Sequence, residues 1–126
     1  MTVRNSAGKE TEIPGVDLAA QYACAAGALL LTTEDTPYEE ALHCVLLNGN
    51  VDMLDDVELS NRMTPGTLSA VRIEEEDALV FSFFGGDLWR LTVFKEPVRK
   101  LLTRTGVHYP HSSLFGKHYL DLRRVK

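Results

Sequence analysis

The chain has 126 residues, of which 44% are hydrophobic and 25% are charged, and its formal net charge is −5. This length fits one domain with one core, so we expect a single β domain over residues 1–126. The near-average composition excludes a disordered or fibrous protein.

Glycine and proline punctuate the chain at short intervals, which leaves most segments too short for a typical helix and favours an all-β fold. Residues 17–26 are ambiguous, because Asp17 could cap an alanine-rich helix while alternate residues also follow a strand pattern. We expect a strand here because the surrounding chain is β. Residues 28–33 form the next predicted strand.

A hairpin is predicted to join residues 42–47 and 51–59 through the Asn-Gly pair at 48–49. Asn-Gly supplies the positive φ angles that a two-residue type I′ turn needs. That turn would place Cys44 opposite Met53 on a buried face.

Residues 67–73 form a further predicted strand, and a second hairpin joins residues 79–84 and 88–94. A three-residue loop over 85–87 would align Phe81 with Leu91. This register collects six large apolar side chains on one face: Leu79, Phe81, Phe83, Trp89, Leu91 and Val93. Each contributes about 1.5–3 kcal/mol when fully buried, so we expect this hairpin to form the centre of the core.

Residues 98–104 could form a short helix, and residues 118–125 alternate well enough for a last strand. The chain is therefore predicted to be mainly β, as an antiparallel sandwich or partly open barrel of about seven or eight strands, with one or two short helices.

Charge is distributed unevenly along the chain. Residues 10–61 contain eleven carboxylates and no lysine or arginine, whereas residues 97–126 contain seven basic residues and one aspartate. Such asymmetry constrains the choice of partner. It leaves open whether the acidic segment is exposed or is covered by the basic C-terminal segment.

The leading interpretation is a protein-binding domain without catalytic activity, such as an inhibitor, an immunity-like protein or an adaptor. It would recognise a basic partner through an anionic surface, since complementary charge accelerates and selects association. The residues predicted to form this protein-binding surface are Glu39, Glu40, Asp52, Asp55 and Asp56.

The alternative is a small-ligand-binding or catalytic β-barrel. It would use His43 with its neighbouring carboxylates, and Tyr38, in a pocket, since a carboxylate beside an imidazole can support acid–base chemistry. A homodimer joined through the acidic and basic segments is a third arrangement.

No catalytic residue, metal ligand or cofactor is predicted. The histidines at 108, 111 and 118 lack the spacing and nearby cysteines of a zinc site. The two cysteines, Cys24 and Cys44, are too few for a disulfide framework, and both lie in apolar surroundings typical of buried thiols.

Membrane and nucleic-acid partners are not expected. The longest apolar stretch, residues 23–31, is shorter than the roughly 20 residues that span a bilayer, and the N-terminal residues lack the apolar core of a secretion signal. The net negative charge would repel a polyanion. We therefore expect a cytoplasmic protein.

Overall fold

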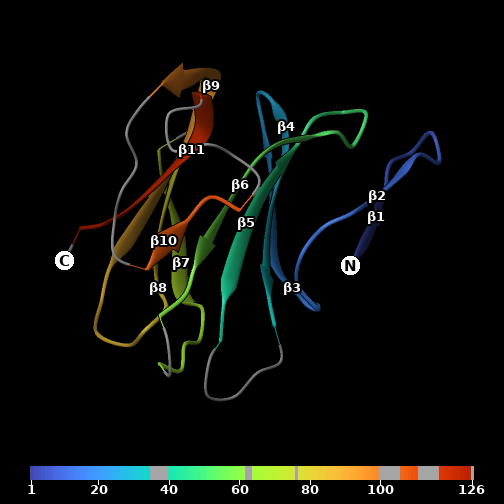
Figure 1. Ribbon diagram of the computed structural model, residues 1–126. Coiled ribbons are helices and arrows are strands. Elements are labelled where there is room, and N and C mark those ends of the chain that lie inside the picture. The colour runs from blue at the N-terminus through green and yellow to red at the C-terminus, as the bar shows by residue number, and fades with distance from the viewer. Residues whose placement is uncertain (35–39, 62–63, 76, 100–105, 111–116, 126) are drawn as a thin grey trace.

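A computed structural model describes residues 1–34, 40–61, 64–75, 77–99, 106–110 and 117–125. Two antiparallel sheets face each other as a β-sandwich, and a short N-terminal hairpin lies to one side (Figure 1). The sheets do not close into a barrel. The prediction of an antiparallel sandwich is thus confirmed.

The five-stranded sheet has the order β10-β6-β5-β4-β3 and the four-stranded sheet the order β11-β9-β8-β7, while β1 pairs with β2. The strands of the larger sheet are β3 Asp17–Cys24, β4 Gly27–Thr33, β5 Leu42–Leu47, β6 Met53–Leu59 and β10 Val107–His108. Those of the smaller sheet are β7 Ser69–Glu75, β8 Ala78–Ser82, β9 Trp89–Arg99 and β11 Lys117–Arg124. The hairpin consists of β1 Thr2–Arg4 and β2 Glu10–Glu12.

The described residues contain no helix, and hence none long and apolar enough to cross a membrane. The helix predicted over 98–104 is wrong at its first two positions, because Val98 and Arg99 continue β9 and pair with β11. Its other residues, 100–104, lie outside the described part. Residues 17–24 form a strand, as expected.

The core between the sheets confirms the predicted face of the second hairpin. All six side chains, Leu79, Phe81, Phe83, Trp89, Leu91 and Val93, are buried there. The register differs by two residues from the prediction, since Phe81 lies opposite Trp89. The carboxylate of Asp87 causes this shift by accepting hydrogen bonds from the Phe83 and Phe84 amides and from the Trp89 indole, which holds a longer loop together.

The predicted two-residue turn after β5 is wrong. Leu47 lies opposite Met53, so the loop spans residues 48–52, and Cys44 faces Val57 instead of Met53. The side-chain oxygen of Asn48 accepts the backbone N–H groups of Asn50 and Asp52 at 2.9 and 3.0 Å. An asparagine that bonds its own backbone in this way stabilises a wider turn than the type I′ form.

A second apolar cluster lies on the outer face of the larger sheet. It consists of the buried residues Ile13, Leu30, Val45, Leu47 and Val51, with Met1, Val3 and Met53 packed against them. The N-terminal hairpin and the segment after it cover this face. As a result, β4 and β5 are buried on both faces, and the polar part of the outer face begins where this cover ends.

Candidate functional site

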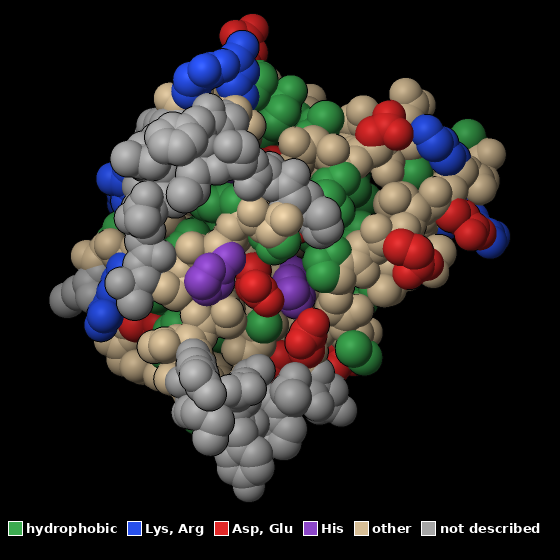
Figure 2. Space-filling model, viewed as in Figure 1, with side chains coloured by type: hydrophobic (Ala, Val, Ile, Leu, Met, Phe, Trp, Pro, Cys, Tyr) green, Lys and Arg blue, Asp and Glu red, His purple; other side chains and the backbone are tan. Residues whose placement is uncertain are grey.

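Polar side chains form a row across the uncovered part of the outer face. His43 on β5 lies opposite Glu58 on β6, and Glu58 lies opposite His108 on β10. Directly opposed residues of antiparallel strands have side chains about 5 Å apart on the same face. Figure 2 shows this row as histidine side chains on both sides of a carboxylate, with further carboxylates gathered beside it.

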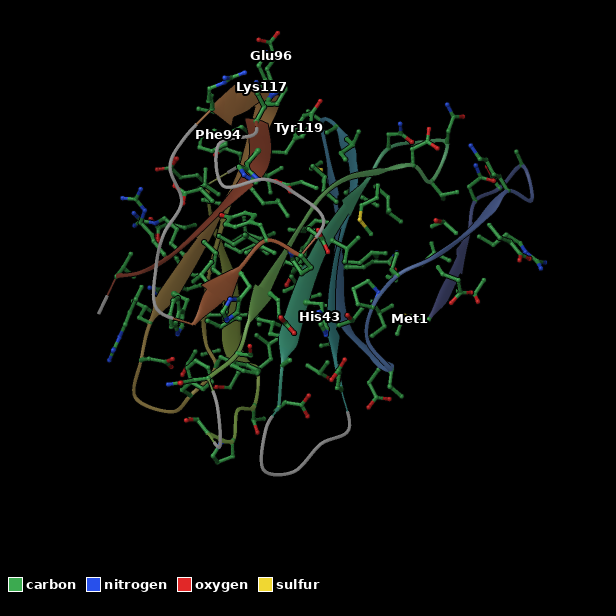
Figure 3. The ribbon with its side chains drawn as sticks, in the orientation of Figure 1. Met1, His43, Phe94, Glu96, Lys117 and Tyr119 are labelled. Carbon is green, nitrogen blue, oxygen red and sulfur yellow. The ribbon has the colours of Figure 1, made fainter. Side chains whose placement is uncertain are left out.

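Glu34, which follows β4, extends this row. Its Oε1 atom lies 3.2 Å from Nε2 of His43, which is only 6% exposed (Figure 3). The side chain of Glu34 is 44% exposed, so its carboxylate contacts both the buried imidazole of His43 and solvent. Such a contact orients the imidazole ring and places negative charge at the surface.

The carboxylate of Glu40 has a local structural role. Its Oε1 accepts hydrogen bonds from the backbone N–H of Glu34 at 2.6 Å and from that of Ala41 at 3.2 Å. Glu40 thus ties together the two ends of the connection between β4 and β5, and it helps to hold Glu34 beside His43.

An open hollow of about 510 Å³ lies next to the row. We call it the acidic hollow, and its lining residues are Glu34, Ala41, Glu58, Ser60, Asn61, Gly106 and His108. Two carboxylates contribute to it, and none of these described lining residues is a lysine or arginine. Carboxylates are acceptors only, so the hollow suits a group that donates hydrogen bonds and carries positive charge.

Within the described ranges, no group of three or more histidine, cysteine, aspartate or glutamate side chains is arranged to hold a metal ion. The hollow has polar or charged side chains at five of its seven described lining residues, and His43 is not among these residues. It therefore differs from the apolar pocket reaching His43 that a small-ligand-binding barrel would need. Tyr38, the other residue predicted for that pocket, lies outside the described residues.

The predicted anionic surface does not form as expected. Asp55 and Asp56 are only 3% and 2% exposed, so their assignment to an accessible surface is wrong. Asp55 points between the sheets, because it shares the inward face with Val57, whereas Asp56 is buried on the outer face opposite Val45. Glu39 lies outside the described residues.

Asp52 is exposed, as predicted, but it is engaged within the chain. Its Oδ1 lies 3.2 Å from the Lys9 ammonium, and Asn48 donates to its other oxygen. The hydrogen bond from Lys9, followed by that from Asn48, lowers the pKa of Asp52. Asp52 therefore anchors the N-terminal hairpin to the turn after β5.

Two arginines of the basic C-terminal segment, Arg99 and Arg123, do not neutralise the acidic segment within the described part of the chain. Arg123 pairs with Asp121 at 3.1 Å. Among the described residues, no ion pair joins Arg99 or Arg123 to a carboxylate of residues 10–61.

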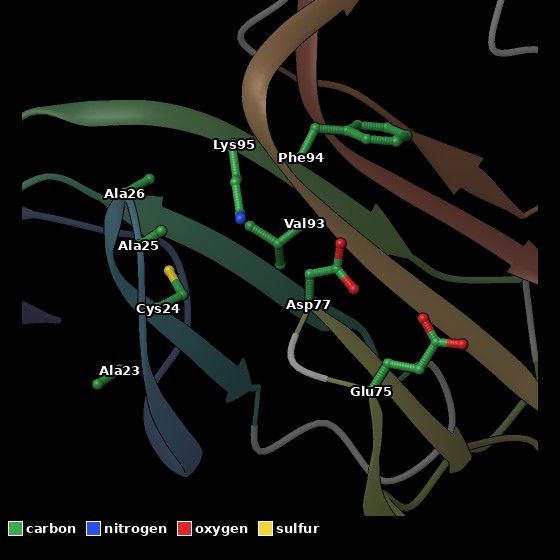
Figure 4. Close-up of a pocket in the computed structure, with 9 residues that line it drawn as sticks. All are labelled: Ala23, Cys24, Ala25, Ala26, Glu75, Asp77, Val93, Phe94 and Lys95. Atoms are coloured by element: carbon green, nitrogen blue, oxygen red, sulfur yellow. The ribbon is translucent and has the colours of Figure 1, made fainter.

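A second, larger cleft of about 690 Å³ lies at one end of the sandwich (Figure 4). It separates the turn between β3 and β4 from the turn between β7 and β8, and part of β9 completes its wall. Its side chains mix both charges with small apolar groups: Ala23, Cys24, Ala25, Ala26, Glu75, Asp77, Val93, Phe94 and Lys95. This mixture selects no single class of ligand.

Glu34, Glu58 and His108, which line the hollow, are not among the residues predicted from the sequence to form the binding surface. The alternation of the strands correctly places His43 on the face opposite Cys44. The assumed two-residue turn, however, would set His43 opposite Leu54, whereas the longer loop sets it opposite Glu58. The pairing of β10 with β6, which brings His108 to the row, joins strands about 50 residues apart and leaves no local signal.

No protein-family model matches the chain, and no curated protein or solved structure is significantly similar to it.

Proposed function

We propose that the chain is a protein-binding domain without catalytic activity, of the inhibitor, immunity-like or adaptor kind, and that it recognises a basic partner. The acidic hollow would receive a lysine or arginine side chain of that partner. The observation that carries this proposal is the pair of carboxylates, Glu34 and Glu58, at one hollow with no lysine or arginine among its described lining residues.

The structure of the hollow supports recognition of a cation in two ways. The backbone N–H of Glu34 donates to Glu40 and its carboxylate contacts His43, so part of the ordering that binding requires is already present. Guanidinium and ammonium groups form charge-assisted hydrogen bonds with carboxylates, and these are stronger than neutral ones.

The interaction is proposed to take place in the cytoplasm. The free thiols of Cys24 and Cys44 agree with a reducing compartment. The competing function is a small-ligand-binding or catalytic site that uses His43 and its neighbouring carboxylates, and the observation that favours it is the 3.2 Å contact between Glu34 and His43.

The proposal can be tested with short peptides that differ only in a central lysine, arginine or glutamine, followed by NMR. We expect the basic peptides to shift the amide signals of Ala41, Ser60 and Gly106, and the glutamine peptide to leave them in place. Charge-assisted hydrogen bonds contribute about 1.5–3 kcal/mol. The double change Glu34→Gln with Glu58→Gln should therefore weaken binding about tenfold or more.

A matched control changes two exposed carboxylates of the smaller sheet, Glu75→Gln with Glu96→Gln, and alters the net charge equally. Glu96 lies at the far end of the molecule from His43 (Figure 3). Equal loss of binding in both double variants would show that net charge alone attracts the peptide, and would overturn the proposal. A free amine that binds as well as the basic peptides would favour the small-molecule alternative.

A further inference from the structure

The four edge strands of the sandwich differ in how they are protected. An edge strand presents unpaired backbone N–H and C=O groups, and proteins commonly shield it with charges, prolines, irregular pairing or short length. β10 is only two residues long, and β11 carries Lys117, Arg123 and Arg124. β7 carries Arg72 and two glutamates, and its pairing with β8 is irregular at two places.

β3 lacks this protection. From Leu18 to Cys24 it has the sequence LAAQYAC, which contains neither a charged residue nor a proline. Its pairing with β4 is irregular only between Leu18 and Ala20, and the following residues to Cys24 pair without interruption. No other described strand pairs with its free side.

Exposed apolar side chains lie at the same edge. Four large hydrophobic residues are exposed in the described chain, and two of them, Val16 at 66% and Leu18 at 49%, are at the start of β3. An uncharged, regular edge with exposed apolar residues is a surface on which another strand can add.

We propose that β3 pairs in antiparallel fashion with β3 of a second copy of this chain, with Gln21 at the two-fold axis. The two five-stranded sheets would then form one continuous ten-stranded sheet. A two-fold axis makes the contact self-complementary, because each residue of one copy faces the symmetry-related residue of the other.

The side chains of β3 suit a second copy. Gln21 is the midpoint of the uncharged run, and its amide can both donate to and accept from the Gln21 amide of the other copy. Ala19 would face Ala23, so small residues meet across the new pair. Asp17 would face Ala25, which keeps the carboxylates of the two acidic chains apart.

Sedimentation equilibrium of the full chain, from low micromolar to several hundred micromolar, tests the proposal. We expect a reversible monomer–dimer equilibrium. Gln21→Lys and Gln21→Glu should each weaken the dimer at least tenfold, because each places like charges opposite one another at the axis. If net charge alone governed association, the lysine variant of this acidic protein would associate more strongly than the unchanged protein, and the glutamate variant more weakly.

The control variants are Ser69→Lys and Ser69→Glu on β7, an exposed position of another edge strand. They make the same charge changes and should leave the dimer unchanged. Thermal unfolding of all four variants checks that each is folded.

Hydrogen exchange provides a second measurement. Dimer formation should slow exchange at alternate backbone amides of residues 20–24, whose N–H groups point away from β4. A chain that stays monomeric at every concentration would overturn the proposal. So would a dimer that is as tight in both Gln21 variants as in the unchanged protein, or one in which amides of β3 gain no protection.

Discussion

The carboxylate of Asp55 projects from β6 into the space between the sheets, where one of its oxygens accepts the backbone N–H groups of Tyr119 at 2.9 Å and Leu120 at 3.0 Å. The pairing of β11 with β9 shifts between His118 and Leu120. A shift of this kind releases backbone groups from the ladder, and Asp55 satisfies them from the opposite sheet. Nδ1 of His118, which is 1% exposed, lies 3.5 Å from the carboxylate.

Asp55→Ala tests this link between β6 and β11. The change leaves the two amides of Tyr119 and Leu120 without this acceptor and removes a buried carboxylate from His118. Leaving a buried N–H donor unsatisfied costs about 1–3 kcal/mol, so loss of the acceptor of two such donors should cost about 2–6 kcal/mol in total. We expect the free energy of unfolding, measured by urea denaturation at neutral pH, to fall by about that amount.

Asp55→Asn is the matched variant, since it keeps one acceptor oxygen and should cost less. Asparagine has nearly the same shape as aspartate but carries no charge, so this variant also isolates the effect of the charge. Desolvation raises the pKa of Asp55 against the opposing effects of the Leu120 amide and His118. A raised pKa in the folded state means that protonated Asp55 contributes to the free energy of unfolding. This contribution is fully present below the ordinary aspartate pKa of about 3.9, and it is lost as pH rises through the higher pKa of Asp55 in the folded state. The stability advantage of the unchanged protein over the asparagine variant should therefore shrink as pH rises; an advantage that grows would contradict the assignment.

Individual strands were predictable because alternation is a local property of the sequence. The six apolar residues of β8, β9 and their loop lie on one buried face in both the predicted and the observed register, because the two registers differ by an even number of residues. The registers of the two hairpins depend on Asn48 and Asp87, respectively. The side chain of each accepts hydrogen bonds from the backbone of its own hairpin loop. Those bonds lengthen both turns beyond what turn propensity alone predicts.

Gly27, the first residue of β4, is the position at which close approach of two strands demands the absence of a side chain. Its φ angle is 149°, and a Cβ atom there would lie 2.0 Å from the carbonyl oxygen of Leu47 and 2.8 Å from Cα of Asn48. Both are backbone atoms of the neighbouring strand and its loop, so they cannot turn aside. Gly27→Ala should lower the free energy of unfolding by roughly 2–4 kcal/mol.

Gly49→Ala is the control for this substitution. Gly49 lies in the turn after β5, and a Cβ atom there would have no neighbour within 4 Å. We expect a change within about 0.5 kcal/mol, as for most surface positions. Chemical denaturation of both variants measures the difference, and equal effects would show that the approach of β4 to Leu47 is not tight.

The whole molecule places its apolar residues in two layers, one between the sheets and one beneath the N-terminal hairpin. The second layer explains why β5 is buried at every position. Lys9 attaches the hairpin to Asp52, and the Met1 ammonium donates to the carbonyl of Ile13 at 3.0 Å. The hairpin is therefore part of the sandwich's packing.

Removal of residues 1–12 should expose this outer layer. Met1 and Val3 would be lost, and Leu30 and Val45 would face solvent. Full burial of a large aliphatic side chain contributes about 1.5–3 kcal/mol, so we expect a loss of roughly 3 kcal/mol or more in the free energy of unfolding. Binding of a hydrophobic dye should rise in parallel, and a shortened chain that matches the full chain in both measurements would contradict this role.

The sequence by itself determined the β class, the positions of most strands and the inward face of the central hairpin, because all three follow from alternation and turn residues close together in the chain. Only the tertiary structure decided that Asp55 and Asp56 are buried and that Glu34, Glu58 and His108 meet at one hollow. Cross-strand neighbours depend on loop hydrogen bonds and on pairing between strands far apart in sequence. A one-residue difference in a loop changes those neighbours even where every strand is correctly placed.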